Sequence, residues 1–320
     1  MGPVRSDRAV STVLDVAFAL LLVSASVLLL GLYLTTTDGS LEETRADRTA
    51  ETLSGSTVAV SYDLESIAES DRYEEPETVD DYERTTYGSA TGVLAEAAVA
   101  NATIGDGRLI RYADSFADSV AASVEERFTG SNRNVHVVAS WRPYEDASIR
   151  GEVTAGQRPP PTADTTAATT TASSGTPALN SSELATAYAD EEDIDALAEP
   201  IARSIVRGYF PPERTQLTLE RRGLDRAVTT THYLELADRL DPDHDLERDA
   251  GPLRRSDARA DDANEVLIAG LTELIADDLE SGPIGDELDA IGGDEAELDA
   301  FFEETIAPSD VDITTYTWKE

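Results

Sequence analysis

The stretch VHVVASWRPYEDASIRGEV, residues 135–153, decides the fold class of this chain. Apolar side chains recur at every second position in both halves of the stretch, which is typical of strands with one buried face. The segment between the halves, Arg142–Ala147, contains Pro143 and Asp146, residue types that favour turns. The stretch therefore predicts a β-hairpin.

Extended and helical patterns lie on both sides of this hairpin. Ser56–Tyr62, Thr215–Glu220 and Asp310–Trp318 alternate or are rich in β-branched and aromatic residues, so each predicts a further strand. Helices are expected where apolar residues recur at intervals of three or four, namely over 109–128, 194–209, 224–240 and 263–279. Together the patterns predict an α+β fold with about five short strands and several amphipathic helices.

A tract rich in Pro, Thr, Ala and Ser, residues 156–182, divides the chain after the hairpin. It has almost no bulky apolar side chains, so it cannot bury enough surface to offset the entropy lost on ordering. We expect a disordered linker between an N-terminal part, residues 40–155, and a mainly helical C-terminal part, residues 183–320. Because the C-terminal part has too few expected strands for a stable sheet of its own, one composite domain is favoured over two domains.

The N-terminal segment is the most apolar part of the chain. Residues 16–34, VAFALLLVSASVLLLGLYL, carry no charge. A helix of this length measures about 28 Å, close to the hydrocarbon core of a bilayer. Arg5 and Arg8 precede the segment and acidic residues follow it, so the positive-inside rule places residues 1–9 in the cytoplasm. We expect a transmembrane helix over residues 10–34, in contact with membrane lipid, and an extracellular ectodomain.

The residues ahead of this segment, RAVSTV at 8–13, resemble the processing site (class III signal peptide) of haloarchaeal type IV pilins and pilin-like proteins. The resemblance is limited to about the first 30 residues, and an uncleaved signal anchor is the alternative. It implies that a prepilin-type peptidase cuts between Ala9 and Val10. It also implies that an acidic residue pairs with a neighbouring subunit. Asp15 is the candidate, although it lies sixth rather than fifth after the cut and can instead lie at the membrane interface.

The chain is strongly acidic, with 64 Asp and Glu against 25 Lys and Arg and a formal net charge of −39. The acidic residues are spread along the chain, and Lys319 is the only lysine. This composition is typical of proteins that stay soluble in brine, where salt screens the repulsion, so we expect a halophilic archaeal source. The lack of a basic stripe argues against a nucleic-acid partner. The lack of cysteine excludes disulfides and thiolate chemistry.

No recognised catalytic motif occurs in the sequence, whether nucleophile elbow, phosphate-binding loop, zinc-protease helix or dinucleotide fingerprint. His136 lies in an expected strand, and His232 lies on a helix ridge, where a core-edge histidine is expected. His244 lies in an acidic run, 241–247, that lacks the Gly and the Glu of an EF-hand loop. We therefore expect no enzyme activity, no cofactor, no metal site and no small-molecule substrate.

Two N-glycosylation sequons begin at Asn101 and Asn180, and an extracellular ectodomain would make both usable. The function expected is that of a pilin-like, membrane-anchored surface protein, a minor or accessory component of a type IV pilus or related secretion-type assembly. Its partners would be other pilin-like subunits. A surface binding module unconnected with pili is the alternative, and an anchored surface hydrolase has the least support.

Overall fold

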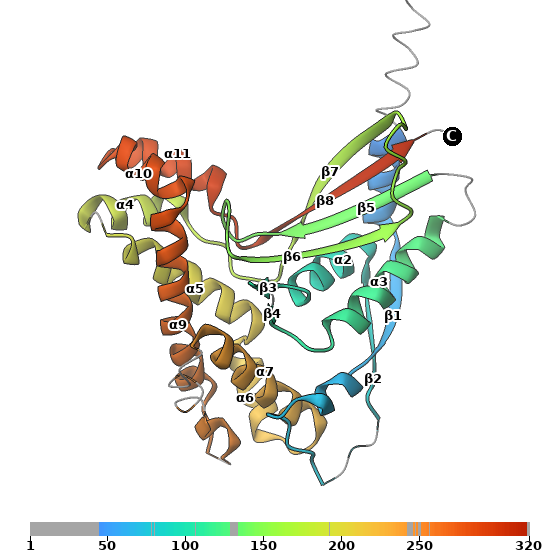
Figure 1. Ribbon diagram of the computed structural model, residues 1–320, viewed down its shortest axis with the longest axis horizontal. Helices are drawn as coiled ribbons and strands as arrows, with labels where there is room; N and C mark the ends of the chain where they lie inside the picture. The colour runs from blue at the N-terminus through green and yellow to red at the C-terminus, as the bar shows by residue number, and fades with distance from the viewer. Residues whose placement is uncertain are drawn as a thin grey trace, which may run out of the picture.

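The computed structural model describes residues 45–318, apart from positions 78, 80, 106, 129–133, 192, 242–245, 247, 249–250 and 256. It begins with a helix over residues 45–55 and continues as shown in Figure 1. The further elements in chain order are β1 (Thr57–Asp63), η1 (Glu65–Glu69), β2 (Glu83–Ser89), α2 (Ala90–Ala100), β3 (Thr103–Ile104), β4 (Gly107–Arg108), α3 (Ala113–Phe128), β5 (Asn134–Trp141), β6 (Ile149–Gly156), β7 (Thr165–Ser173), α4 (Ser181–Glu191), α5 (Asp195–Tyr209), α6 (Pro212–Glu220), α7 (Leu224–Leu240), η2 (Gly251–Arg254), α9 (Ala260–Ser281), α10 (Pro283–Ile291), α11 (Glu295–Thr305) and β8 (Asp310–Trp318).

The main sheet has six antiparallel strands in the order β4-β3-β6-β5-β8-β7. The predicted hairpin is confirmed as β5 and β6, and Val137 of β5 lies opposite Ala155. On its other side β5 pairs with β8, the last strand of the chain, so that Val137 also lies opposite Thr315. Both parts of the chain therefore contribute to one sheet. A separate two-stranded sheet joins β1 to β2.

One face of the main sheet is buried and forms one side of the hydrophobic core. Val137 and Trp141 of β5 and Ile313 of β8 are almost completely buried on this face, and α2 and α3 pack against it. Alternation along β5 and β8 explains this arrangement, because side chains two residues apart point to the same face. The opposite face carries Val138 of β5 and Thr314 of β8, which are only half-buried.

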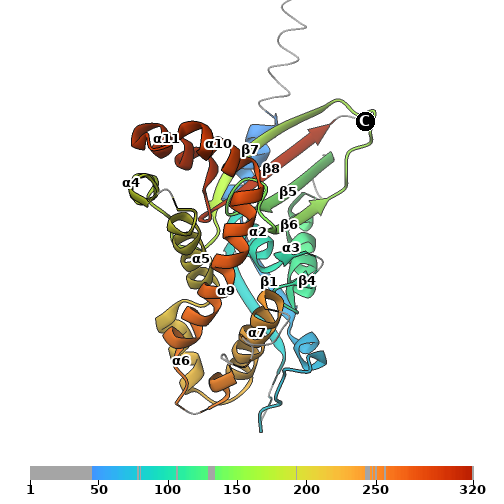
Figure 2. The same cartoon turned by 60° about the vertical axis from the view of Figure 1, so that its left-hand side comes forward.

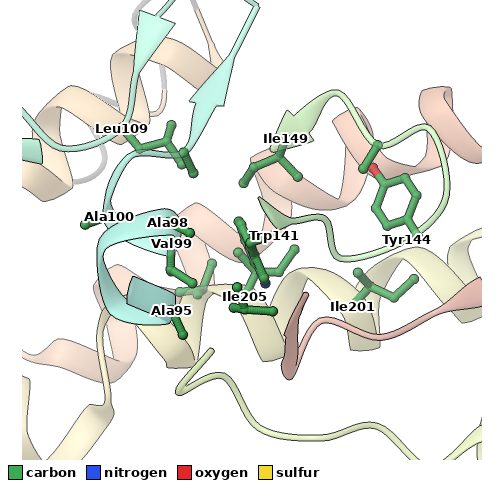
Figure 3. Packing of buried hydrophobic residues seen from close by; sticks show 14 of the residues in the cluster. Ala95, Ala98, Val99, Ala100, Leu109, Trp141, Tyr144, Ile149, Ile201 and Ile205 are labelled. Atoms are coloured by element: carbon green, nitrogen blue, oxygen red, sulfur yellow. The ribbon is translucent and has the colours of Figure 1, made fainter. Parts of the chain in front are cut away.

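The C-terminal part is mainly helical and packs against the end of the sheet. The long helix α9 contacts α5 and α7, and α4 contacts α11, as Figure 2 shows. The predicted apolar stripe of α5, which includes Ile201 and Ile205, is buried. These side chains join the same cluster as Trp141 of β5 and Val99 of α2, seen from close by in Figure 3. A single core therefore connects sheet and helices.

The predicted fold class, an α+β ectodomain on a single transmembrane helix, needs correction. Within residues 45–318, as far as they are described, no helix is long and apolar enough to cross a membrane. The predicted span over residues 10–34 lies outside the described part. The described residues also form eight strands rather than about five, because β-branched and short polar segments pair at the edges of the sheets.

Two local predictions are wrong. Residues 156–182, predicted to be a disordered linker, contain β7, because the threonine-rich run has high strand propensity and finds β8 to pair with. Thr215–Glu220, predicted to be a strand, belongs to helix α6, which begins at Pro212. Thr215 and Leu219 are buried four residues apart, whereas Leu217 is 57% exposed, so the buried side chains follow the helical period rather than alternation.

Candidate functional site

The edge strand β7 is the most distinctive surface of the described domain. It pairs with β8 on one side and ends the sheet on the other. Its nine residues, TTAATTTAS, include no charge and no proline, in a chain whose formal net charge is −39. The side chains at alternate positions, Thr165 to Ser173, are exposed, and the intervening ones are half-buried. Figures 1 and 2 show this strand at the free edge of the sheet.

Cross-strand threonine pairs hold β7 in register with β8. The hydroxyls of Thr166 and Thr317 lie 2.9 Å apart, and those of Thr169 and Thr314 lie 3.0 Å apart. In each pair the two residues lie directly opposite each other in the ladder. Such pairs stabilise a sheet locally and specify register.

Three hydrogen bonds to one carbonyl oxygen fix the chain just after the C-terminal end of β7. The main-chain carbonyl of Pro308 accepts a hydrogen bond of 2.9 Å from the Trp141 indole and one of 2.8 Å from the Ser174 hydroxyl. The hydroxyl of Thr176, a buried residue, donates to the same oxygen. The exposed edge is therefore presented by a rigid element rather than by a loose loop.

The two edges of the sheet are built differently. The opposite edge, β4, is only two residues long. It carries Arg108, whose guanidinium lies 2.7 Å from the Asp114 carboxylate. Short length and charge are the usual protections of an edge strand against pairing with another chain. β7 has neither protection, and none of the strands described by the structure pairs with its outer edge.

The open face of the sheet is uncharged next to the first half of β7, whereas exposed Asp312 and Asp310 of β8 lie opposite Thr171 and Ser173 in its second half. One row across the strands consists of Thr169, Thr314, Val138 and Thr154. The neighbouring row includes His136, whose ring lies 6.2 Å from that of Tyr316. His136 therefore lies in a strand as predicted. The two rows form an uncharged band next to β7.

The predicted processing and pairing residues, Ala9, Val10 and Asp15, lie outside the described residues. Asn101 ends α2, and its side-chain amide donates a hydrogen bond of 2.7 Å to the carbonyl of Glu152. Asn180 is exposed, and its side-chain oxygen accepts a hydrogen bond of 3.1 Å from the N–H of Ser182 at the start of α4. The Asn101 side chain thus bonds to strand β6, and the Asn180 side chain bonds to the first turn of α4. Glycosylation at either asparagine stays a prediction.

No cluster of metal-ligating side chains occurs in the part of the chain that the structure describes. His244 of the acidic run lies outside that part. His232 is buried in α7, as expected for a core-edge histidine. Sequence reasoning missed the β7 edge, although its β-branched composition was a usable signal.

Comparison with known proteins identifies a family for this chain but no activity. A family model described as "Family of unknown function (DUF7284)" matches residues 14–318. The match extends from the N-terminal segment to the end of β8. Neither the curated proteins nor the solved structures include a match to this chain.

Proposed function

This chain belongs to the family of unknown function DUF7284, and we propose that it is a pilin-like accessory subunit of a surface assembly. The assembly would be a type IV pilus or a related secretion-type system of a halophilic archaeon. In this proposal a prepilin-type peptidase cuts between Ala9 and Val10, and the folded domain joins neighbouring subunits at the cell surface. The observation that carries the proposal is the outer edge of β7, which has no charged side chain and pairs with no strand among the described residues.

The occupant proposed for this edge is an extended segment of a neighbouring pilin-like subunit. Main-chain hydrogen bonds would add that segment to the sheet next to Thr165–Ser173, as in other cases of strand addition. Contact between two acidic surfaces is opposed by repulsion, whereas contact through an uncharged edge is not. The segment that fits is therefore rich in β-branched residues and free of acidic side chains.

The path of the chain into the domain supports the same proposal. Ala46, Ala50 and Leu53 lie on the helix over residues 45–55, and all three side chains are buried. Leu53 belongs to the main core. The helix lies beside β7 and β8 in both views of Figures 1 and 2. The start of the described domain is therefore packed next to the edge at which we propose that a neighbouring subunit binds.

The test is the incorporation of an edge variant into the assembly. Thr169→Lys places a charge on β7, and Thr186→Lys places the same charge on an exposed position of α4 as a matched control. We expect Thr169→Lys to fold normally. Its amount in the high-mass surface fraction should be at least tenfold lower than that of the wild type, whereas the amount of Thr186→Lys in this fraction should be unchanged. Equal incorporation of both variants would overturn the proposal.

The mature N-terminus tests the processing step separately. Mass spectrometry of the chain recovered from the assembly should find Val10 as the first residue. A recovered chain that still contains Arg8 rules out pilin-type processing, whatever the result for β7.

A further inference from the structure

The two N-glycosylation sequons of the chain lie in different local structures. Asn101 ends α2, whereas Asn180 directly precedes α4. In N-glycosylation a bulky sugar is joined to the side-chain Nδ2 atom of the asparagine, and the hydroxyl residue two positions later completes the acceptor. A folded acceptor therefore needs an exposed asparagine whose Nδ2 atom is not required for a structural hydrogen bond.

The first sequon, Asn101-Ala102-Thr103, does not meet this requirement. The Nδ2 atom of Asn101 donates a hydrogen bond of 2.7 Å to the carbonyl of Glu152 in β6. Its Oδ1 atom accepts one from the Arg108 guanidinium. The Asn101 side chain is half-buried, Ala102 is completely buried, and Thr103 pairs with β6 as part of β3. A sugar on Nδ2 would therefore have to displace the edge of the sheet.

The second sequon, Asn180-Ser181-Ser182, meets it. The Oδ1 atom of Asn180 accepts hydrogen bonds from the N–H groups of Ser182, at 3.1 Å, and Glu183, at 3.4 Å. These are N–H groups of the first turn of α4, so the oxygen caps the helix. Among the described residues, the Nδ2 atom makes only one hydrogen bond, a long one of 3.3 Å to the exposed Glu183 carboxylate. Asn180 and Ser182 are both exposed.

The chain just before Asn180 is held in place. The carbonyl of Pro177 accepts a hydrogen bond of 2.6 Å from the Ser204 hydroxyl of α5. The side chain of Leu179 packs against the main core. Asn180 therefore lies at a fixed point of the surface, with its oxygen toward the helix and its nitrogen available.

We propose that Asn180 carries an N-linked oligosaccharide and that Asn101 stays unmodified. The donor would be an oligosaccharide linked through phosphate to a lipid. The bond between its anomeric carbon and the phosphate oxygen breaks, and the phosphate leaves with the electron pair. The Nδ2 atom of Asn180 bonds to the anomeric carbon and loses one proton. The amide keeps its carbonyl oxygen, so the cap of α4 is retained.

This proposal rests on the extracellular placement of the domain in the proposed function. The test is peptide mass spectrometry of the full-length chain, recovered from the surface of its source organism. We expect the peptide that contains Asn180 to carry the glycan with an occupancy at least tenfold higher than that of the Asn101 peptide. Equal or higher occupancy at Asn101, or no glycan at Asn180, would overturn the proposal.

Two matched variants remove one sequon hydroxyl each and leave both asparagines in place. Ser182→Ala should lower the intact mass of the recovered chain by the whole mass of the glycan, whereas Thr103→Ala should leave the glycan mass unchanged. Asn180→Asp adds a check, because it keeps the capping oxygen and removes only the acceptor nitrogen. A glycan mass that persists in Ser182→Ala and in Asn180→Asp would contradict the assignment.

The same material separates this proposal from the assembly role. A chain that begins at Val10 and is recovered in the high-mass surface fraction without a glycan on Asn180 would overturn the glycan assignment alone. A chain that carries the glycan on Asn180 but is absent from that fraction would support the assignment and contradict the assembly role.

Discussion

The phenol of Tyr209 in α5 donates a hydrogen bond of 2.7 Å to the main-chain carbonyl of Val99 in α2. The ring of Tyr209 also meets the Trp141 indole edge-on, with 6.3 Å between their centroids. These contacts join the helical part of the chain to the helix that lies under the sheet. Burial raises the pKa of the Tyr209 phenol, which stays protonated and able to donate.

Removal of the Tyr209 hydroxyl should weaken this junction. We expect Tyr209→Phe to lower the free energy of unfolding by about 1 kcal/mol, since one buried hydrogen bond is lost while the ring contacts remain. Denaturant unfolding in concentrated salt measures the change. Tyr87→Phe is the control, because Tyr87 is 73% exposed. An equal loss in both variants would show that the hydrogen bond to Val99 has no specific role.

The approach of α2 to the sheet depends on a glycine. A Cβ atom at Gly151 of β6 would lie 1.9 Å from the carbonyl oxygen of Ala98, so α2 would have to move. We expect Gly151→Ala to destabilise the domain by about 3 kcal/mol or more. Gly55→Ala is the matched control, because a Cβ there meets nothing within 4 Å. Thermal unfolding that is unchanged in Gly151→Ala would contradict the close approach.

Asp278 of α9 holds the turn after β5. Its carboxylate accepts hydrogen bonds of 2.6 Å from the Tyr144 phenol and 2.8 Å from the N–H of Ser148. The Ser148 hydroxyl donates a further bond of 2.6 Å. We expect Asp278→Ala to cost about 3 kcal/mol of unfolding free energy, because three donors lose a charged acceptor. Asp277→Ala, at an exposed neighbouring position, should change it by less than about 0.5 kcal/mol.

The buried His232 should make stability depend on pH. The ring takes up a proton near pH 6.5 when unfolded and near pH 4 when folded. Between these values the unfolded state binds more protons, so the free energy of unfolding falls as the pH falls. The part due to His232 is at most about 3 kcal/mol.

This prediction is measured as a difference between two chains. His232→Phe removes the titrating ring, while the carboxylates titrate in both proteins and cancel. The stability of the wild type relative to the variant should decline between about pH 7 and about pH 4. A difference that is independent of pH would show that the ring is not buried in its neutral form.

The sequence allowed prediction of those elements whose pattern reflects one buried face. The hairpin of β5 and β6 and the stripe of α5 are of this kind. Helix α2 has no such stripe, because nine of its eleven residues are buried on nearly all sides. Its alanines therefore show no amphipathic period, although they allow the close approach to Gly151.

The candidate site was harder to predict, because it depends on partners distant in the chain. β7 forms a strand only because β8, which begins at Asp310, provides an edge to pair with. Low apolar content does not exclude strand pairing at an edge, and Ala172 and Leu179 of the tract even pack against the core.

Cross-linking from β7 tests the assembly role most directly. The chain has no cysteine, so Thr169→Cys can be labelled at a single site with a photoreactive benzophenone, and Thr186→Cys serves as the control. In assembled material we predict an adduct between position 169 and a neighbouring pilin-like subunit, with none from position 186. Incorporated chains that give no adduct from position 169, or the same adduct from both positions, would contradict the account.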